Sequence, residues 1–117
     1  MSVAQIAGLS AVEIVGDFGF KEFANKGGLF PFLVGSFGYV GVVLMLIVSL
    51  QGSSILMVNG AWDGISTIIE SLAAYLFLGE RFESVYQYLG LLLIIVGLFL
   101  LKIPLTKAKA FVWPKMW

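Results

Sequence analysis

Four acidic side chains lie inside segments that are otherwise apolar. Glu13 and Asp17 belong to the first apolar segment, and Asp63 and Glu70 belong to the third. The basic residue nearest to Glu13 is Lys21, about 12 Å away along a helix. A carboxylate at the centre of a membrane-spanning helix costs roughly 2.5–3.5 kcal/mol on insertion scales. A chain that bears this cost usually uses the group to bind or move something charged, so these acids are the first candidates for function.

Glu13 is suited to exchanging a proton for a cation. Desolvation disfavours the charged form of a carboxylate, so such a group can release its proton when a cation binds and regain it when the cation leaves. Asp17 lies one turn further on the same face, and its spacing from Lys21 predicts a salt bridge at the membrane boundary. The alternatives are a protonated Glu13 that only hydrogen-bonds another helix and an Asp17 with a structural role.

The third apolar segment carries a polar stripe beside a tryptophan. The spacing places the polar side chains on one helical face, and they are Asn59, Asp63, Thr67 and Glu70. Trp62 borders this stripe. An aromatic ring beside carboxylates suits an organic cation, through cation–π contact and charge neutralisation. We interpret the stripe as a wall of a cation site, with core packing as the alternative role of Trp62.

The second and fourth apolar segments contribute an aromatic hydroxyl and smooth helix surfaces. Tyr39 lies in the uncharged second segment, where its hydroxyl needs a partner, and a carboxylate is the obvious one. Glycines flank Tyr39 and give its helix a face for close packing. Gly90 and Gly97 are two helical turns apart in a fourth segment without membrane-embedded polar groups. A helix of that kind suits helix–helix association better than substrate contact.

Four helices must position these residues. Of the 117 residues, 60% are hydrophobic and 12% are charged, whereas soluble domains carry about 25% charged residues. The segments are continuously apolar and do not alternate, which indicates helices and not barrel strands. We predict an all-α integral membrane protein of the cell membrane, with a single domain over residues 1–105. Its four transmembrane helices per protomer are predicted at about 3–20, 29–50, 55–78 and 85–101.

The connections between these segments are short and polar. Residues 21–28 are charged and glycine-rich and predict a turn. The connection 51–54 is so short that we expect the second and third helices to be antiparallel neighbours. The tail 106–117 is basic with two tryptophans, which predicts a place at the lipid headgroups. The Lys and Arg bias near the membrane is weak and permits insertion in both orientations, hence an antiparallel dimer, unless the tail lysines fix the C-terminus in the cytoplasm.

Composition excludes several classes of function. The chain contains no cysteine and no histidine, which removes disulfides, thiolate or imidazole metal sites and catalytic triads. Its formal net charge of zero gives no indication of a nucleic-acid partner. No nucleophile–base pair is visible, so we predict no enzyme activity, no cofactor and no metal.

Several short motifs keep a common order and spacing. They are A-V-E-I-V-G from Ala11 followed by Lys21, then Pro31, Tyr39, A-W-x-G from Ala61, G-E-R from Gly79, and G-L-L-L-I-I-V-G-L from Gly90. In this combination the chain resembles the small multidrug resistance transporters of the drug/metabolite transporter superfamily, over nearly its whole length. The resemblance implies a four-helix protomer that works as an antiparallel dimer and exchanges protons for small organic cations.

The same resemblance implies roles for single residues. Glu13 would be the membrane carboxylate shared by proton and substrate, and Trp62 and Tyr39 would be the aromatic residues of the site. The fourth helix, with Gly90 and Gly97, would form the dimer. The family commonly has tyrosine in place of Asn59 and a small neutral residue in place of Asp63.

These departures, with the extra acids Asp17 and Glu70, favour compact or multiply charged substrates such as polyamines over bulky drug cations. The polyamine-exporting branch is similar in having an acid after the tryptophan, and guanidinium or quaternary ammonium ions remain as further candidates. Homodimerisation is expected. The alternatives are a partner-dependent subunit of a heterodimeric transporter or flippase, and a cation-selective pore lined by the acids.

Overall fold

The computed structural model describes residues 2–103 and 110–116, and within them the chain forms four helices and no strands. The helices are α1 (Val3–Lys26), α2 (Leu29–Leu50), α3 (Ile55–Phe77) and α4 (Val85–Leu101). The all-α prediction is therefore confirmed for the described residues. The bounds of α2, α3 and α4 agree with the predicted segments to within one residue.

The first helix is longer than predicted, because the charged residues 21–26 continue it instead of forming a turn. Their side chains are exposed, so the additional helical turns bury no charge. The helix ends at Gly27, whose φ of 71° lies in the region that favours glycine and whose N–H donates to the carbonyl of Phe23 at 2.8 Å. The turn predicted over 21–28 is wrong in extent and comprises only Gly27 and Gly28.

Serine side chains begin three of the helices. Ser2 accepts from the N–H of Gln5 at 3.1 Å, and the Gln5 side chain accepts from the N–H of Ser2 at 3.0 Å. Ser84 and Gln87 form the same reciprocal arrangement at the start of α4. Ser54 accepts from a backbone N–H in the first turn of α3. Each cap satisfies donors that a helix leaves free at its N-terminus, which fixes where the helix begins.

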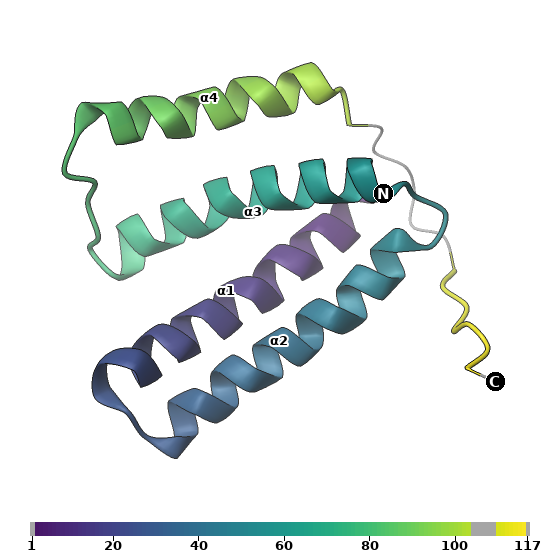
Figure 1. The fold of residues 1–117 in the computed structure, drawn as a ribbon, viewed down its shortest axis with the longest axis horizontal. Coiled ribbons are helices and arrows are strands. Elements are labelled where there is room, and N and C mark those ends of the chain that lie inside the picture. Colours follow the sequence, from purple (N-terminus) through teal and green to yellow (C-terminus); the bar gives the residue numbers. More distant parts are fainter. Residues whose placement is uncertain (1, 104–109, 117) are drawn as a thin grey trace.

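Helices α1 and α2 form an antiparallel hairpin with their backbones in close contact (Figure 1). A Cβ atom added at Gly19 would lie 2.5 Å from the backbone nitrogen of Gly35, and one added at Gly38 would lie 2.5 Å from the Cα of Gly16. Only glycine fits at such contacts. The glycine-lined face predicted for the second helix is therefore the face that packs on α1.

Helix α3 packs on α1 and hardly touches α2, although the loop of residues 51–54 joins α2 to α3 (Figure 1). Helices α2 and α3 run in opposite directions, as predicted, but they are neighbours only at the ends that the loop joins, where Leu46 and Leu50 pack against the cluster that holds Val58 and Ala61. A short loop brings two helix ends together and does not align the rest. Helix α4 lies on the far side of α3, where Leu98 contacts Gly64 and Leu101 contacts Gly60.

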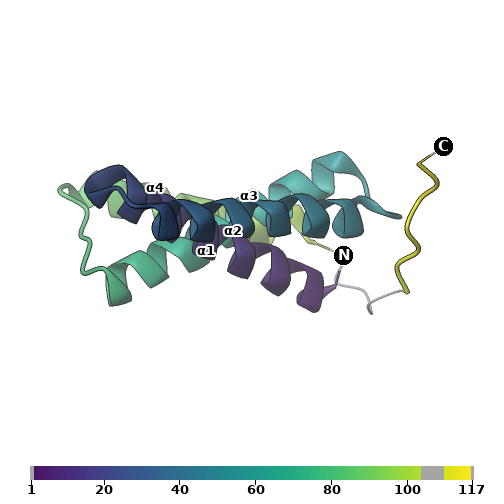
Figure 2. The same ribbon diagram turned by 90° about the horizontal axis from the view of Figure 1, so that it is seen from below.

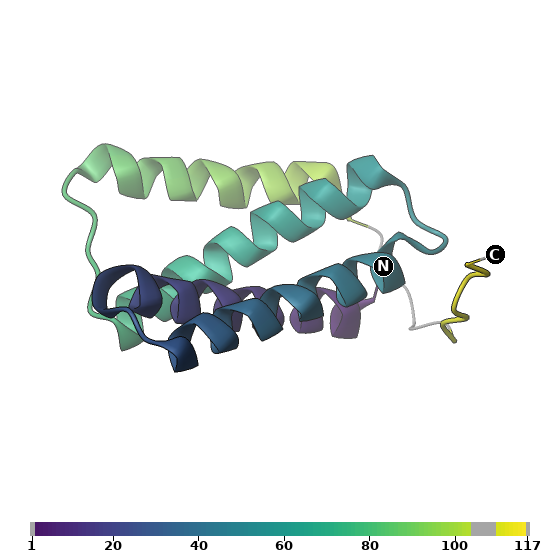
Figure 3. The same ribbon diagram turned by 60° about the horizontal axis from the view of Figure 1, so that its bottom comes forward.

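The helices form a shallow layer and do not close into a bundle. The chain measures 43 × 39 × 19 Å, and α4 contacts neither α1 nor α2 (Figures 2 and 3). Few of the described hydrophobic side chains are buried, and they are Ile6, Leu9, Val42, Val58 and Ala61. Large apolar side chains of all four helices are exposed instead. A single protomer therefore leaves most of its apolar surface uncovered.

Two of the helices, α1 and α2, are long and apolar enough to span a membrane. Only 28% of the apolar stretch of α1 and 22% of that of α2 is buried, whereas a core helix of a soluble protein is mostly buried. Helix α4 is apolar but shorter, with 17 residues. Helix α3 is continuous, but Asp63 and Glu70 interrupt its apolar sequence.

The described part of the tail, residues 110–116, contains no helix and runs across the ends of the helices (Figures 1 and 2). Gln51 holds it: its side-chain amide donates to the carbonyl of Val112 at 2.8 Å and accepts from the N–H of Val112 at 3.2 Å. The other residues of the predicted tail 106–117 lie outside the described residues.

Candidate functional site

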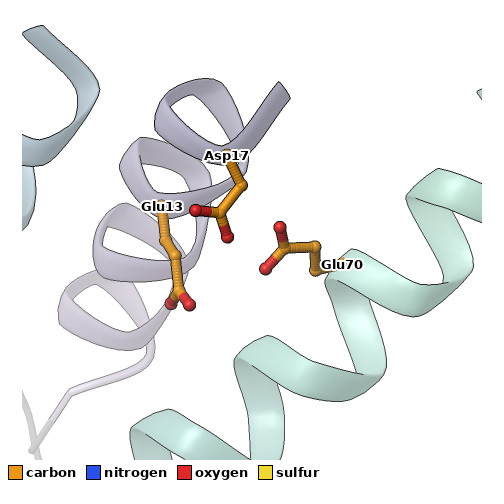
Figure 4. A group of neighbouring side chains, drawn as sticks. All are labelled: Glu13, Asp17 and Glu70. Carbon is orange, nitrogen blue, oxygen red and sulfur yellow. The ribbon is translucent and has the colours of Figure 1, made fainter. Parts of the chain in front are cut away.

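Three of the four acids converge where α1 crosses α3 (Figure 4). Glu13 and Asp17 come from successive turns of α1, and Glu70 comes from α3. One carboxylate oxygen from each lies within 4.8 Å of the others, and all three residues are half-buried. Carboxylates this close repel one another when all are ionised. The cluster therefore has a strong electrostatic preference for a proton or another cation.

Trp62 supplies the partner that Glu13 lacks on its own helix. The indole Nε1–H donates to Oε2 of Glu13 at 2.7 Å, which joins α3 to α1. The distance lies at the short end of the range for N–H···O hydrogen bonds. Glu13 and Trp62, predicted as members of one site although they are 49 positions apart in the sequence, are thus in direct contact.

Tyr39 reaches the cluster from α2, and its hydroxyl donates to a carboxylate oxygen of Asp17. A carboxylate partner was predicted, and the structure identifies it as Asp17. The tyrosine ring packs over Gly16, where an added Cβ would lie 2.7 Å from a ring carbon. The Phe20 ring lies 5.5 Å from that of Tyr39. Gly16 therefore provides the space that lets a residue of α2 contact an acid of α1.

Asn59 and Asp63 do not join the cluster. Both are exposed on α3, on the face that they share with Thr67, whose hydroxyl donates to the carbonyl of Asp63. Of the polar stripe predicted on this helix, only Glu70 meets the acids of α1. The stripe therefore divides into one half-buried acid and an exposed polar surface next to it.

Lys21 pairs with Glu80, in the connection between α3 and α4, and not with Asp17. The predicted Asp17–Lys21 salt bridge is wrong because the Asp17 side chain is turned towards Tyr39 and α3. Lys21, one turn further along α1, reaches the α3–α4 connection instead. Sequence reasoning missed Glu80, and no spacing rule within one helix could have found it.

A cavity of about 460 Å³ opens beside the cluster. Asp17 and Glu70 line it together with the Lys21–Glu80 pair and residues from the end of α3. Its size lies in the range of small-molecule sites. Asp17 and Glu70 are thus reachable from a space large enough for an organic cation, and Glu13 lies behind them in the cluster, outside the cavity lining.

The three carboxylates do not by themselves select a metal ion. Ca²⁺ takes six to eight oxygen ligands and Mg²⁺ needs near-ideal octahedral geometry, whereas this group brings together three carboxylates. The neighbouring groups are an indole and a phenol, which are not ligands that such hard cations prefer. The arrangement suits a cation that interacts through charge and aromatic contact.

Comparison of the chain with protein-family models, with curated proteins and with solved structures finds no match. The assignment of function therefore depends on the site.

Proposed function

We propose that this protein is a proton-coupled antiporter that exports small organic cations across a cell membrane. The observation that carries the proposal is the convergence of Glu13, Asp17 and Glu70, with Trp62 donating to Glu13 from the opposite helix. The cluster supplies negative charge, and the indole supplies an aromatic group beside Glu13. The adjoining cavity, which Asp17 and Glu70 line, supplies room for the cargo.

The proposed mechanism is competition between protons and substrate for the same carboxylates. Three adjacent carboxylates cannot all be ionised without repulsion in a low-dielectric surrounding. An entering organic cation replaces a proton at Glu13, and a returning proton displaces the cation. Because both ligands need the same group, the site carries them in opposite directions across the membrane.

The membrane location is part of this proposal and is supported by the exposed apolar surface. The flat layer of helices leaves large apolar side chains uncovered, including Phe30 at 77% and Leu56 at 88% exposure. Lipid or a second protomer would cover such a surface. We propose that α1 to α4 all span the membrane, with the shorter α4 completed by the residues that flank it.

Assembly into a dimer is the next part of the proposal. Helix α4 has no buried residue and contacts α3 alone among the helices. At Gly90 and Gly97 an added Cβ would meet nothing within 4 Å. This helix therefore has a free glycine-bearing face, which suits an antiparallel homodimer as the resemblance to small multidrug resistance transporters implies.

The same free face favours one alternative, in which the chain is a subunit that needs a different partner. The orientation of the chain in the membrane distinguishes the homodimer from the heterodimeric subunit. A homodimer of antiparallel protomers requires both orientations in one membrane, and a heterodimeric subunit has a single one. Labelling a C-terminal tag from each side of intact membranes gives both signals in the first case and one in the second.

The substrate class follows from the number of acids. Asp17 and Glu70 add charge beside Glu13, and Asp63 lies exposed on the neighbouring face. We propose a compact or multiply charged cation, with polyamines ahead of quaternary ammonium ions. An equal gain in polyamine tolerance, relative to an empty vector, in cells with wild type and in cells with Asp63→Asn contradicts a role for Asp63 in this choice.

The deciding experiment uses purified protein in liposomes with an imposed pH gradient. Uptake of guanidinium, spermidine and a quaternary ammonium ion is compared between wild type and Glu13→Gln. We expect gradient-dependent uptake by wild type and none by Glu13→Gln, which keeps the shape but cannot ionise. In detergent, substrate addition releases protons from wild type only. Undiminished release by Glu13→Gln refutes the mechanism.

A further inference from the structure

The Arg81 side chain lies on an aromatic face inside the cavity wall. Its guanidinium carbon is 3.5 Å from the centroid of the Tyr75 ring, well within the range of a cation–π contact. One guanidinium nitrogen, Nη1, donates to the carbonyl oxygens of Tyr75 at 2.8 Å and of Glu80 at 2.7 Å. This position of the structure therefore holds a planar guanidinium by stacking and by hydrogen bonds to backbone.

Tyr75 and Arg81 line the same 460 Å³ cavity as Asp17 and Glu70. Tyr75 follows Glu70 by five positions on α3, a rise of about 7.5 Å along the helix. One cavity thus contains an aromatic face that can bind a guanidinium and two carboxylates that can bind a second positive charge. Small dications have this form, because a short alkyl chain joins their two positively charged groups.

We propose that this cavity binds an aminoalkyl guanidinium dication, and that Arg81 occupies its guanidinium position as a tethered competitor. The bound dication stacks its guanidinium on Tyr75 in place of Arg81 and directs its ammonium group to Asp17 and Glu70. Transport of this ligand rests on the proposed function, whereas its binding to the cavity does not depend on transport.

The competition follows from what each guanidinium can contact. Arg81 gains the Tyr75 ring and two carbonyl oxygens, but its other end is fixed to the backbone and carries no second charge. The dication makes the ring contact and also neutralises the acids of the inner wall. Among the described residues Arg81 has no carboxylate within salt-bridge distance, since Glu80 pairs with Lys21. Its release from Tyr75 therefore breaks no ion pair.

The test measures binding of agmatine, which has one guanidinium and one ammonium group, by calorimetry on the detergent-purified protein. Putrescine, with an ammonium group at each end, is the comparison ligand. Arg81→Gln removes the competitor, and we expect agmatine to bind about two- to fivefold more tightly, the range of an exposed cation–π contact. Putrescine gains less, so the preference for agmatine increases.

Tyr75→Leu removes the stacking face. In the Arg81→Gln background it should cancel the gained preference for agmatine. Tyr86→Leu removes a tyrosine that is 82% exposed on α4 and should leave binding unchanged. Elution of every variant at the wild-type volume in gel filtration establishes that the fold is retained.

Two results overturn the inference. An equal gain for agmatine and putrescine in Arg81→Gln shows that only net charge changed. Agmatine binding that is insensitive to Tyr75→Leu shows that the Tyr75 ring does not bind the guanidinium group of agmatine. Liposome uptake separates this inference from the proposed function. Agmatine binding without gradient-driven uptake of any cation contradicts only the proposed transport. Uptake of other cations without agmatine binding contradicts only the proposed agmatine site in the cavity.

Discussion

Gly38→Ala tests whether the α1–α2 contact is as close as the structure places it. A Cβ atom at Gly38 would lie 2.5 Å from the Cα of Gly16 and 2.9 Å from the carbonyl oxygen of Val12. Carbon atoms in contact are about 3.5–4.0 Å apart, so the two helices must separate by about 1 Å. Backbone atoms cannot rotate away as a side chain does, and overpacking of this kind costs about 1–3 kcal/mol.

The matched control is Gly8→Ala, because an added Cβ there would meet only Cε and Sδ of Met45, at 2.7 and 3.6 Å, and this flexible side chain can move aside. Both changes replace a glycine inside a helix, so the difference in helix propensity between glycine and alanine cancels in the comparison. We expect Gly38→Ala to unfold at lower denaturant than Gly8→Ala, by a difference of about 1–3 kcal/mol in unfolding free energy.

The assay is reversible unfolding in detergent micelles, followed by helical circular dichroism. Gly38→Ala should also impair cation uptake, because Tyr39 is the next residue and separation of the helices withdraws its hydroxyl from Asp17. Equal stability of the two variants refutes the close backbone packing. Full uptake by a destabilised Gly38→Ala refutes the link between this packing and the site.

Two further changes test single contacts. Tyr39→Phe removes the hydroxyl that donates to Asp17. We expect the variant to elute like wild type in gel filtration but to bind substrate with altered affinity in calorimetry. Identical affinity would exclude Tyr39 from the site. Lys21→Glu and Glu80→Lys each break a half-exposed salt bridge, and each should lower the unfolding free energy by about 0.2–1 kcal/mol. The double exchange should restore thermal stability. Additive losses in the double variant would show that the two side chains do not interact.

The positions of the helices could be predicted from hydropathy and from turn residues because these signals are local. The end of α1 was predicted too early, since the charged segment after Phe20 reads as a turn but is stable as an exposed helix end. The order of packing could not be predicted from loop length. Helix α1 lies between α2 and α3 because its glycines admit α2 on one side and its larger side chains meet α3 on the other.

The candidate site was predicted in part. Glu13 and Trp62 were assigned to one site from residue types and the resemblance, and their hydrogen bond is a contact between helices that no spacing rule gives. Periodicity predicts which polar residues of α3 share a helical face, but it does not predict how much of that face a neighbouring helix covers. Glu70 meets α1, whereas Asn59 and Asp63 stay exposed.

The two sides of α1 explain why the acids gather where they do. Against the backbone of α2 the helix presents Gly16 and Gly19. Next to this contact it presents Glu13 and Asp17, which meet Trp62 and Glu70 of α3, and Asp17 also accepts from the Tyr39 hydroxyl of α2. These contacts are made by side chains, and Asp17 and Glu70 also line the open cavity.

A backbone-packed hairpin moves as one body, because any shear produces steric overlap. The contact between α1 and α3 combines apolar packing of Ile6 on Val58 and Ala61 with the hydrogen bond from Trp62 to Glu13. The Lys21–Glu80 pair lies at its end. In the proposed mechanism, replacement of a proton by a cation in the cluster changes the polar part of that contact directly. We therefore propose that the α1–α3 crossing is where occupancy of the site becomes movement of α3 against the α1–α2 hairpin.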